Sequence, residues 1–243
     1  MNDYFIDMHS HILPGVDDGA KDVEEMKKML QIAYDEGIRC IIATPHHHPH
    51  RGRAPVETLK KRAAILRQAA HEIDGRFRIF MGTEIYFGQD VAQKLKEGKI
   101  LSMNRREYVL VEFPPSQTYQ YIRQGLQQLQ FAGYEVILAH VERYHCIVEE
   151  PELAEELHDM GVNLQVNAGS ITGDSGRKIK KFIEGLMDQD LVFCVGTDAH
   201  DTKKRPPKMK KAAKHVEKKY GEDYTRRIFY SNAKEMLKKR VKE

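Results

Sequence analysis

The sequence predicts an α/β fold built on parallel strands, and two features of the chain carry this prediction. Short apolar runs rich in β-branched residues recur seven times along the 243 residues. Amphipathic stretches with helical spacing lie between them, and several end near a glycine, as helix C-termini prefer. Strands that alternate with helices at intervals of roughly 25–40 residues imply parallel βαβ units. Seven strands favour a closed barrel, and an open doubly wound sheet is the alternative.

These patterns place the strands and the clearest helices along the chain. Strands are expected at residues 4–8, 39–44, 78–83, 108–113, 135–140, 163–168 and 192–197. Helices are expected at residues 23–37, beginning near Asp22, and at residues 119–134. No low-complexity linker or change in composition interrupts this alternation, so residues 1–243 are expected to form a single domain.

The composition excludes several classes of protein. Hydrophobic residues make up 41% and charged residues 31% of the chain, as in ordinary globular proteins, and a net charge of +3 is too small to indicate nucleic-acid binding. Three widely spaced cysteines do not make a disulfide framework, which favours a reducing compartment. The N-terminus lacks the pattern of a secretion signal, and no apolar run reaches the roughly 18 residues of a membrane span. We therefore expect a cytoplasmic protein.

Almost every predicted strand ends in a side chain that can bind a metal ion. The set comprises His9, His11, His46, Glu84, Glu112, His140, Asp198 and His200. In a parallel barrel the carboxyl ends of all strands lie on one face, where active sites are built, so these residues should meet. The sixth strand is the exception, because it ends in Asn167, Gly169 and Ser170 and offers no strong ligand.

Taken singly, each of these residues also has an ordinary structural explanation. His9 and His11 point the same way from an extended segment, but two surface histidines would do so too. Glu84 and Glu112 follow apolar strands, where a carboxylate needs either a metal ion or a salt-bridge partner. Their co-occurrence at the ends of six strands favours a metal site. A mixture of imidazoles and carboxylates without thiolates favours Mn, Fe or Zn over Mg or Ca.

Two short segments leave the roles of their residues open. The stretch ATPHHHPHRG at 43–52 contains four histidines, and Pro45 and Pro49 exclude a helix that would align them. The spacing does not decide whether this stretch is a metal-binding cluster, an accidental polar loop, or one working histidine with three bystanders. Asp17 and Asp18 lie in a turn, where aspartate favours turn and capping chemistry, and the pattern does not choose between them.

The cysteines do not fit a cysteine-based phosphatase, in which an arginine follows the nucleophile by six positions. The residues six positions after Cys40, Cys146 and Cys194 are His46, Glu152 and His200. Cys40 and Cys194 lie inside apolar strands and are expected to be core residues.

Two peripheral features have two interpretations each. The basic run at 203–221 is expected to form a solvated helix face, and docking to an acidic tail or a membrane surface is the alternative. Tyr119 and Tyr121 lie near the predicted rim, where they would either hold a substrate ring or pack beneath a loop.

Together the motifs DMHSHILPGVDDG, TPH, GTE, VEFP, AHVERY and GTDAH resemble the PHP superfamily of metal-dependent phosphoesterases. More narrowly, they are similar to the bacterial manganese-dependent protein-tyrosine phosphatases of the CpsB/CapC (YwqE-like) type. The resemblance runs from Asp7 to Arg205 with the motifs in the family's order. It implies a distorted seven-stranded, TIM-like β/α barrel that holds three divalent metal ions, with Mn favoured and Fe or Zn as alternatives.

The resemblance also implies roles for individual residues. His9, His11, Glu84 and Asp198 would hold one ion; Glu84, Glu112 and His140 would hold the second; Asp18, His46 and His200 would hold the third. Arg143 and Arg205 match arginines that grip phosphate. Of the histidines at 43–52, only His46 would then bind metal, and the roles of His47, His48 and His50 remain open.

The implied activity is hydrolysis of phosphotyrosine, by attack of a metal-bound hydroxide on phosphorus. Three divalent ions among four carboxylates leave a charge of about +2, which attracts a dianionic phosphate. A tyrosine leaving group, with a pKa of about 10, departs with little protonation. The implied partner is a bacterial tyrosine kinase that controls capsule or exopolysaccharide synthesis, which would recruit the protein peripherally to a membrane.

Two other functions are compatible with the same motifs. A phosphatase of the same superfamily would act on histidinol phosphate or a sugar phosphate, whose alkyl leaving groups need more help from an acid. A domain kept only for binding is the third interpretation, and the intact set of ligands argues against it.

Overall fold

A computed structural model describes residues 4–105 and 107–238 of the chain. The strands are β1 (Phe5–Ser10), β2 (Ile38–Ala43), β3 (His46–His47), β4 (Arg78–Met81), β5 (Glu84–Tyr86), β6 (Tyr108–Glu112), β7 (Glu135–Leu138), β8 (Asn163–Asn167) and β9 (Val192–Gly196). The longer helices are α1 (Val23–Asp35), α2 (Val56–Ile73), α4 (Tyr119–Phe131), α6 (Glu152–Asp159), α8 (Arg177–Asp188) and α9 (Lys210–Arg226). The shorter ones are α3 (Val91–Lys96), η1 (Met103–Arg105), η2 (Val141–Arg143), α5 (His145–Glu149), α7 (Ala168–Thr172), η3 (Arg227–Ser231) and α10 (Asn232–Lys238).

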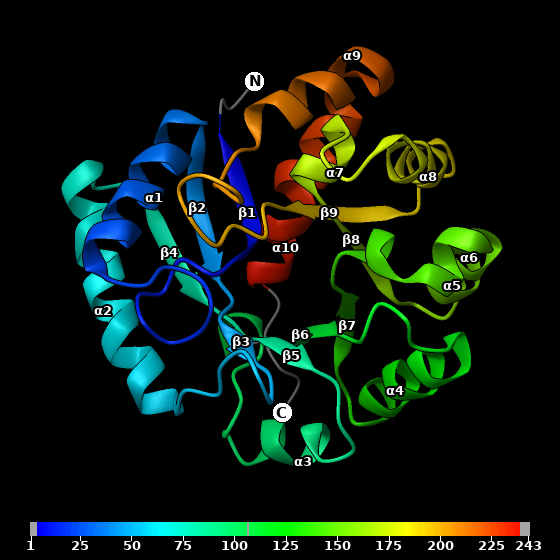
Figure 1. Cartoon of the computed structure of the whole chain (residues 1–243), viewed down its shortest axis with the longest axis horizontal. Coiled ribbons are helices and arrows are strands. Elements are labelled where there is room, and N and C mark those ends of the chain that lie inside the picture. Colours follow the sequence, from blue (N-terminus) through cyan, green and yellow to red (C-terminus); the bar gives the residue numbers. More distant parts are fainter. Residues whose placement is uncertain (1–3, 106, 239–243) are drawn as a thin grey trace.

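The fold is mixed α/β with parallel strand pairing, as predicted. One sheet has the order β1-β2-β4 and the other β3-β5-β6-β7-β8-β9. A parallel bridge also joins Ser10 to Ala199, and the Asp198 amide donates to the His9 carbonyl at 2.7 Å. The end of β1 therefore lies beside the segment that follows β9. Figure 1 shows the strands in the middle of the molecule, with α1 and α2 on one side and α4, α5, α6 and α8 on the other.

The strands separate two apolar layers because successive side chains of a strand point to opposite faces. One layer packs beneath the helices and includes Ile41, Val111 and Val166. The other includes Met8 and Ile137, and it is covered by residues of η3 and α10: Tyr230, Ala233 and Met236. Figure 1 accordingly shows α10 at the centre of the molecule, behind the strands. This layer fills the space beneath the strand ends that carry the predicted ligands.

The predicted helices form where expected, and their caps explain their starts. Asp22 caps α1 by accepting from the Glu25 amide at 2.8 Å, and Thr118 caps α4. In the basic run the helix begins only at Lys210, after Pro206 and Pro207, and its lysines face solvent. The prediction of a solvated helix face is therefore confirmed for this part of the run. No helix among the described residues is long and apolar enough to cross a membrane.

Two of the seven predicted strands are broken, which corrects their predicted ends. The run predicted at 78–83 forms β4 only as far as Met81, and a separate strand, β5, begins at Glu84. The break contains Gly82, where a side chain would lie 2.4 Å from the Met103 sulfur. Glu84 therefore begins a strand instead of ending one. Pro45 separates β2 from β3 in the same way, so His46 also begins a strand. Both breaks lie immediately before a predicted ligand.

Candidate metal centre

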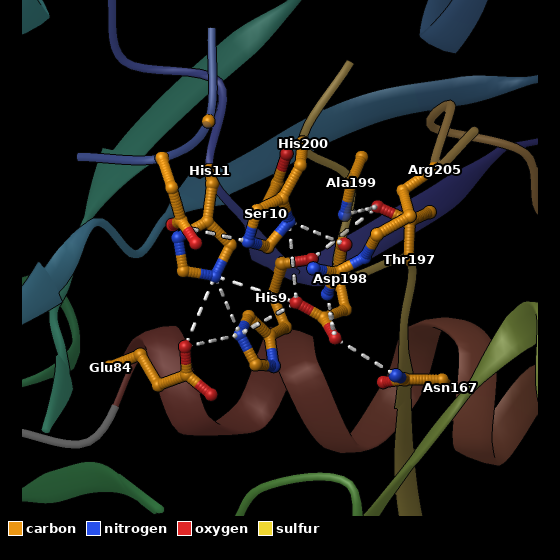
Figure 2. A network of polar contacts seen from close by, with 12 residues as sticks. His9, Ser10, His11, Glu84, Asn167, Thr197, Asp198, Ala199, His200 and Arg205 are labelled. Carbon is orange, nitrogen blue, oxygen red and sulfur yellow. Dashed lines mark hydrogen bonds and ion pairs between the residues drawn. The ribbon is translucent and has the colours of Figure 1, made fainter. Parts of the chain in front are cut away.

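The predicted ligands from both ends of the chain converge in one buried cluster. His9 on β1 and His11 just after it have their Nε2 atoms 3.1 Å apart. The Nε2 atom of His11 lies 3.1 Å from Glu84 Oε2 and 3.5 Å from Asp198 Oδ1. Figure 2 shows these side chains, together with His200, pointing toward one another from different elements. The side chains of His9, His11, Glu84 and Asp198 are nearly inaccessible to solvent.

Among the described residues, three groups have ligand atoms close enough together to hold an ion. One group is His9, His11, Glu84 and Asp198, the second is His11, Asp18, His46 and His200, and the third is His46, Glu84 and Glu112. The first is identical to an expected set, and the second contains another expected set with His11 added. The third has His46 where His140 was expected. His140 lies next to it, with Nε2 2.8 Å from Glu84 Oε1 and 3.9 Å from Glu112 Oε2.

The geometry of these contacts fits metal ligands better than it fits a hydrogen-bond network. His46 Nδ1 is 3.0 Å from Glu84 Oε2 and 3.1 Å from Glu112 Oε1, yet none of the three atoms has a hydrogen-bond partner. The Nε2 atoms of His46 and His200 are also buried without one. Buried polar atoms are almost always hydrogen-bonded, so a cluster of exceptions needs an explanation. These atoms are explained if their lone pairs are directed at shared metal cations.

Several of these histidines are oriented by a hydrogen bond at the other ring nitrogen. His11 Nδ1 pairs with Asp17 Oδ2 at 2.9 Å, and His9 Nδ1 pairs with Gln165 Oε1 at 3.0 Å. His200 Nδ1 lies 2.9 Å from the Asp198 carbonyl oxygen. When Nδ1 donates to an oxygen, Nε2 of a neutral imidazole is left without a proton and can bind metal. In all three rings it is Nε2 that faces the cluster.

The structure separates the roles of the two neighbouring aspartates. The side chain of Asp17 is buried, and it also accepts from the backbone amides of Gly19 and His46, at 3.0 and 2.9 Å. Asp18 is 46% exposed, and its Oδ1 lies 3.3 Å from His46 Nε2 and 3.5 Å from His200 Nε2. Asp18 is thus the aspartate beside the expected partners, while Asp17 holds the supporting backbone.

The backbone is strained at two of the converging residues. His140 has φ of 36° and Asp198 has φ of 52°, in the left-handed region that few residues other than glycine adopt. Each follows the end of its strand, β7 and β9, by two residues. Such conformations cost of order 1–3 kcal/mol and cluster at functional sites.

The two predicted arginines lie at the edge of the same cluster. Arg143 Nη2 and Arg205 Nη2 are each 2.5 Å from Asp198 Oδ2, and about a third of each side chain is exposed. They come from η2 and from the loop after β9, which are distant in sequence. Two guanidinium groups beside a buried ligand group can bind the oxygens of an incoming phosphate.

The charges of the cluster compensate one another in the metal-free protein. Burial raises the pKa of the Glu84 carboxyl, but His9, His11 and His140 outweigh this effect and hold the pKa well below its usual value. Burial lowers the pKa of His46, but Asp18, Glu112 and Glu84 raise it to about 10. A raised pKa means that the imidazole holds a proton, which a metal ion binding to the same nitrogen would displace.

The other histidines of the 43–52 stretch lie outside the three groups. His48 accepts from the His50 amide at 3.0 Å, and its ring lies 4.2 Å from that of Tyr86. His50 is exposed. Burial, with Lys94 and Arg53 nearby, lowers the pKa of His47 to about 4. The stretch is therefore not one cluster, because only His46 meets ligands from other strands.

The remaining candidates have structural environments. Tyr121 packs edge-on against Phe87 and Phe113, and Tyr119 donates to Glu156 at 2.8 Å. These contacts favour packing over binding of a substrate ring. Cys40 and Cys194 are buried, as predicted, and burial raises the pKa of both thiols. All three cysteines are free.

Sequence reasoning missed the residues that support the ligands. Gln165, buried within β8, contacts His9, and Asn167 donates to Asp198 Oδ2 at 3.0 Å. Asp7 accepts from the Thr197 amide and hydroxyl at 2.8 and 2.6 Å, which ties the segment after β9 to β1. A polar residue inside an apolar strand, such as Gln165, was the signal that could have revealed this support.

Comparison with known proteins identifies the family. The model of the family described as "Capsular polysaccharide synthesis, CpsB/CapC" matches residues 5–238. The chain belongs to the CpsB/CapC family. Tyrosine-protein phosphatase CpsB of Streptococcus pneumoniae is 32% identical over 96% of this chain and 98% of that protein. Tyrosine-protein phosphatase YwqE of Bacillus subtilis is 35% identical over 90% and 86%, respectively.

The fold of a solved CpsB/CapC structure agrees with this membership. It comes from work on YwqE of Bacillus subtilis and CpsB of Streptococcus pneumoniae, described as unique metal-dependent tyrosine phosphatases. The TM-score is 0.89 with 34% sequence identity, over 97% of this chain and 95% of that one. The resemblance expected from the motifs is therefore confirmed over nearly the whole chain.

Proposed function

We propose that this protein is a metal-dependent protein-tyrosine phosphatase, a hydrolase of phosphoric monoesters that acts on phosphotyrosine. The observation that carries the proposal is the buried convergence of histidines and carboxylates in a chain whose named relatives are tyrosine-protein phosphatases. Two arginines at the edge of that cluster supply what a phosphate ester needs beyond the metal ligands.

The ions of the proposed site would be held by nine residues. They are His9, His11, Asp18, His46, Glu84, Glu112, His140, Asp198 and His200. We propose three divalent ions, and a set of imidazoles and carboxylates without thiolates favours Mn, with Fe or Zn as alternatives. Bound ions supply Lewis-acid chemistry, because they lower the pKa of water and neutralise charge on a phosphate.

The protein itself would position the phosphate and stabilise its charge. Arg143 and Arg205 share Asp198 Oδ2, and each side chain is partly exposed to solvent. Turning one guanidinium toward a phosphate oxygen leaves the other paired with Asp198, so the carboxylate keeps a partner during binding. A guanidinium held beside developing oxygen charge would lower the barrier by stabilising that charge.

The chemistry of the leaving group supports a tyrosine ester as substrate. A phenol has a pKa of about 10 and departs with little proton transfer. A nucleophilic cysteine has no support among the described residues, because Cys40 and Cys194 are buried on strands and burial raises the pKa of Cys146 as well.

The proposal extends to the architecture and the partner. The Ser10–Ala199 bridge supports a distorted seven-stranded TIM-like barrel, in which β2 with β3 and β4 with β5 each count as one broken strand. We include residues 1–243 in a single catalytic domain. The family's connection with capsular polysaccharide synthesis supports a phosphorylated bacterial tyrosine kinase as substrate, met in the cytoplasm at the membrane surface.

The test compares two substrates on protein purified without an affinity tag. After chelation and refilling with Mn, Fe, Zn or Mg, kcat/KM is measured on a phosphotyrosine peptide and on histidinol phosphate. We expect activity to disappear on chelation, to return with a transition metal, and to favour the peptide. A large preference for histidinol phosphate would replace this function by a small-molecule phosphatase, and activity that survives complete metal removal would refute the metal centre.

A further inference from the structure

Strand β8 contributes no ligand to the cluster, although its neighbours β7 and β9 lead directly to His140 and Asp198. Its carboxyl half nevertheless carries two buried amides, Gln165 and Asn167, at alternate positions that share one face of the strand. Burial of two amides in a strand is costly unless their polar atoms are paired. Their partners explain what β8 does for the site.

Gln165 contacts two residues of the cluster, His140 and His9. Its Oε1 accepts from the His140 backbone amide at 3.0 Å and lies 3.0 Å from His9 Nδ1. Its Nε2 donates to Asn167 Oδ1 at 2.9 Å. Asn167 Nδ2 donates in turn to Asp198 Oδ2 at 3.0 Å, and Figure 2 shows this amide pointing at the Asp198 carboxylate. A continuous chain of hydrogen bonds thus runs from His9 to Asp198.

The two ends of this chain fix the orientation of both amides. The His140 amide can only donate, so the Gln165 atom that meets it must be the oxygen. The ionised Asp198 carboxylate can only accept, so the Asn167 atom that meets it must be the nitrogen. The remaining nitrogen of Gln165 and oxygen of Asn167 then face each other with matching polarity. No flip of either amide satisfies all the contacts.

The orientation of Gln165 in turn decides the tautomer of His9. Because Gln165 Oε1 can only accept a hydrogen bond, the proton of this contact must be on His9 Nδ1. Nε2 of the neutral ring is then unprotonated, and this is the atom that lies 3.3 Å from Glu84 Oε2 and 3.5 Å from Asp198 Oδ1. At Asp198, the donors from Asn167, Arg143 and Arg205 all engage Oδ2, which leaves Oδ1 directed at the cluster.

We propose that Gln165 and Asn167 are positioning residues that hold His9 in its Nδ1-protonated tautomer and turn Asp198 Oδ1 toward the ions. Asn167 has a particular part in this, since either Arg143 or Arg205 would turn from Asp198 to bind phosphate, whereas Asn167 would stay. The inference rests on the proposed metal centre and concerns metal affinity, not the identity of the substrate.

The experiment measures Mn²⁺ affinity by competition with a chelator, beside the melting temperature of the metal-free protein. Asn167→Asp replaces the donor by an acceptor of the same shape, and Gln165→Leu removes the whole relay. Gln165→Glu keeps an acceptor for His9 and the His140 amide. The matched control is Asn163→Asp at the other end of β8, where the amide donates to the Val136 carbonyl at 3.2 Å, away from the cluster.

We expect Asn167→Asp and Gln165→Leu to weaken Mn²⁺ binding by about 10–100-fold, the usual effect of removing a partner of a metal ligand. Gln165→Glu should bind more tightly than Gln165→Leu, and Asn163→Asp should bind like the wild type. Unchanged affinity in Asn167→Asp, or equal losses in the two Gln165 variants, would overturn the relay while leaving the metal centre in place. Wild-type protein that binds neither Mn²⁺ nor Fe or Zn would overturn both proposals.

Discussion

Replacing His46 by alanine gives the sharpest test of how the histidines at 43–52 divide their roles. His46 is 3% exposed and belongs to two of the three groups that can hold an ion. Its Nε2 lies 3.3 Å from Asp18 Oδ1, and its Nδ1 lies 3.0 Å from Glu84 Oε2. His50, four positions later, is exposed, and its ring centroid lies 5.9 Å from that of His48. The same substitution at the two sites should therefore differ greatly in effect.

The size of the difference follows from these contacts. Removing a partner of a metal ligand already costs 10–100-fold, so loss of a ligand that belongs to two groups should lower kcat/KM by about 100-fold or more. That factor corresponds to about 2.7 kcal/mol of transition-state stabilisation. His50→Ala is a surface change and should stay within about 0.5 kcal/mol, or roughly twofold. Its backbone amide, which donates to His48, remains in the variant.

The assay is kcat/KM on a phosphotyrosine peptide at saturating Mn²⁺, together with the metal content of each variant. A melting curve of the metal-free protein shows whether His46→Ala is folded. We expect His46→Ala to lose both metal and activity while His50→Ala keeps both. Equal losses in the two variants would mean that the stretch acts as a cluster, and full activity in His46→Ala would remove it from the site.

Three further predictions follow from the same geometry. Arg205→Ala should raise KM for the phosphotyrosine peptide by about 10-fold or more, because charge-assisted hydrogen bonds are worth about 1.5–3 kcal/mol. The metal content should stay unchanged, and a parallel fall in metal content would contradict a phosphate-binding role. Gly196→Ala should lower the free energy of unfolding of the metal-free protein by about 1–3 kcal/mol, because the new Cβ would lie 2.5 Å from the His9 Cβ. The control is Gly185→Ala on helix α8, where no atom lies within 4 Å of the new Cβ, so alanine should raise the free energy of unfolding by about 0.5–1 kcal/mol. Similar melting curves for the two variants would refute the close approach at Gly196. Mn²⁺ added to the metal-free wild type should raise its melting temperature, and a titration without any shift would argue against ligands that bind only the folded state.

The sequence predicted the elements well because their signals are local. Apolar β-branched runs placed β1, β2, β6, β7, β8 and β9 to within about two residues, the usual uncertainty of element ends. Asp22 was predicted as the start of α1 and does cap it. The twofold repeat of a strand also predicted that His9 and His11 would point the same way, and their Nε2 atoms are 3.1 Å apart. Parallel strands then predicted that ligands from distant motifs would meet.

Local spacing failed where two neighbours of similar chemistry compete. Asp17 and Asp18 are adjacent in one turn, and only the folded turn shows that the Asp17 side chain contacts His11 while that of Asp18 lies beside His46 and His200. The resemblance to known phosphatases had favoured Asp18, but the pattern of residues by itself had not. The break at Gly82 was also missed, because the close approach of Met103 that requires it comes from a distant segment.

By itself, the sequence determined the alternation of strands and helices, the set of candidate metal-binding side chains and, through its motifs, the family. The tertiary structure decided which atom of each side chain faces the cluster, because a tautomer or a carboxylate rotamer depends on partners from other strands. Gln165 and Asn167 show this most clearly: in the sequence β8 ended without a ligand, and in the fold its amides meet His9 and Asp198. A strand that appeared to contribute nothing to the site proves to contact it from beneath, since parallel pairing sets its side chains beside the ligands of its neighbours.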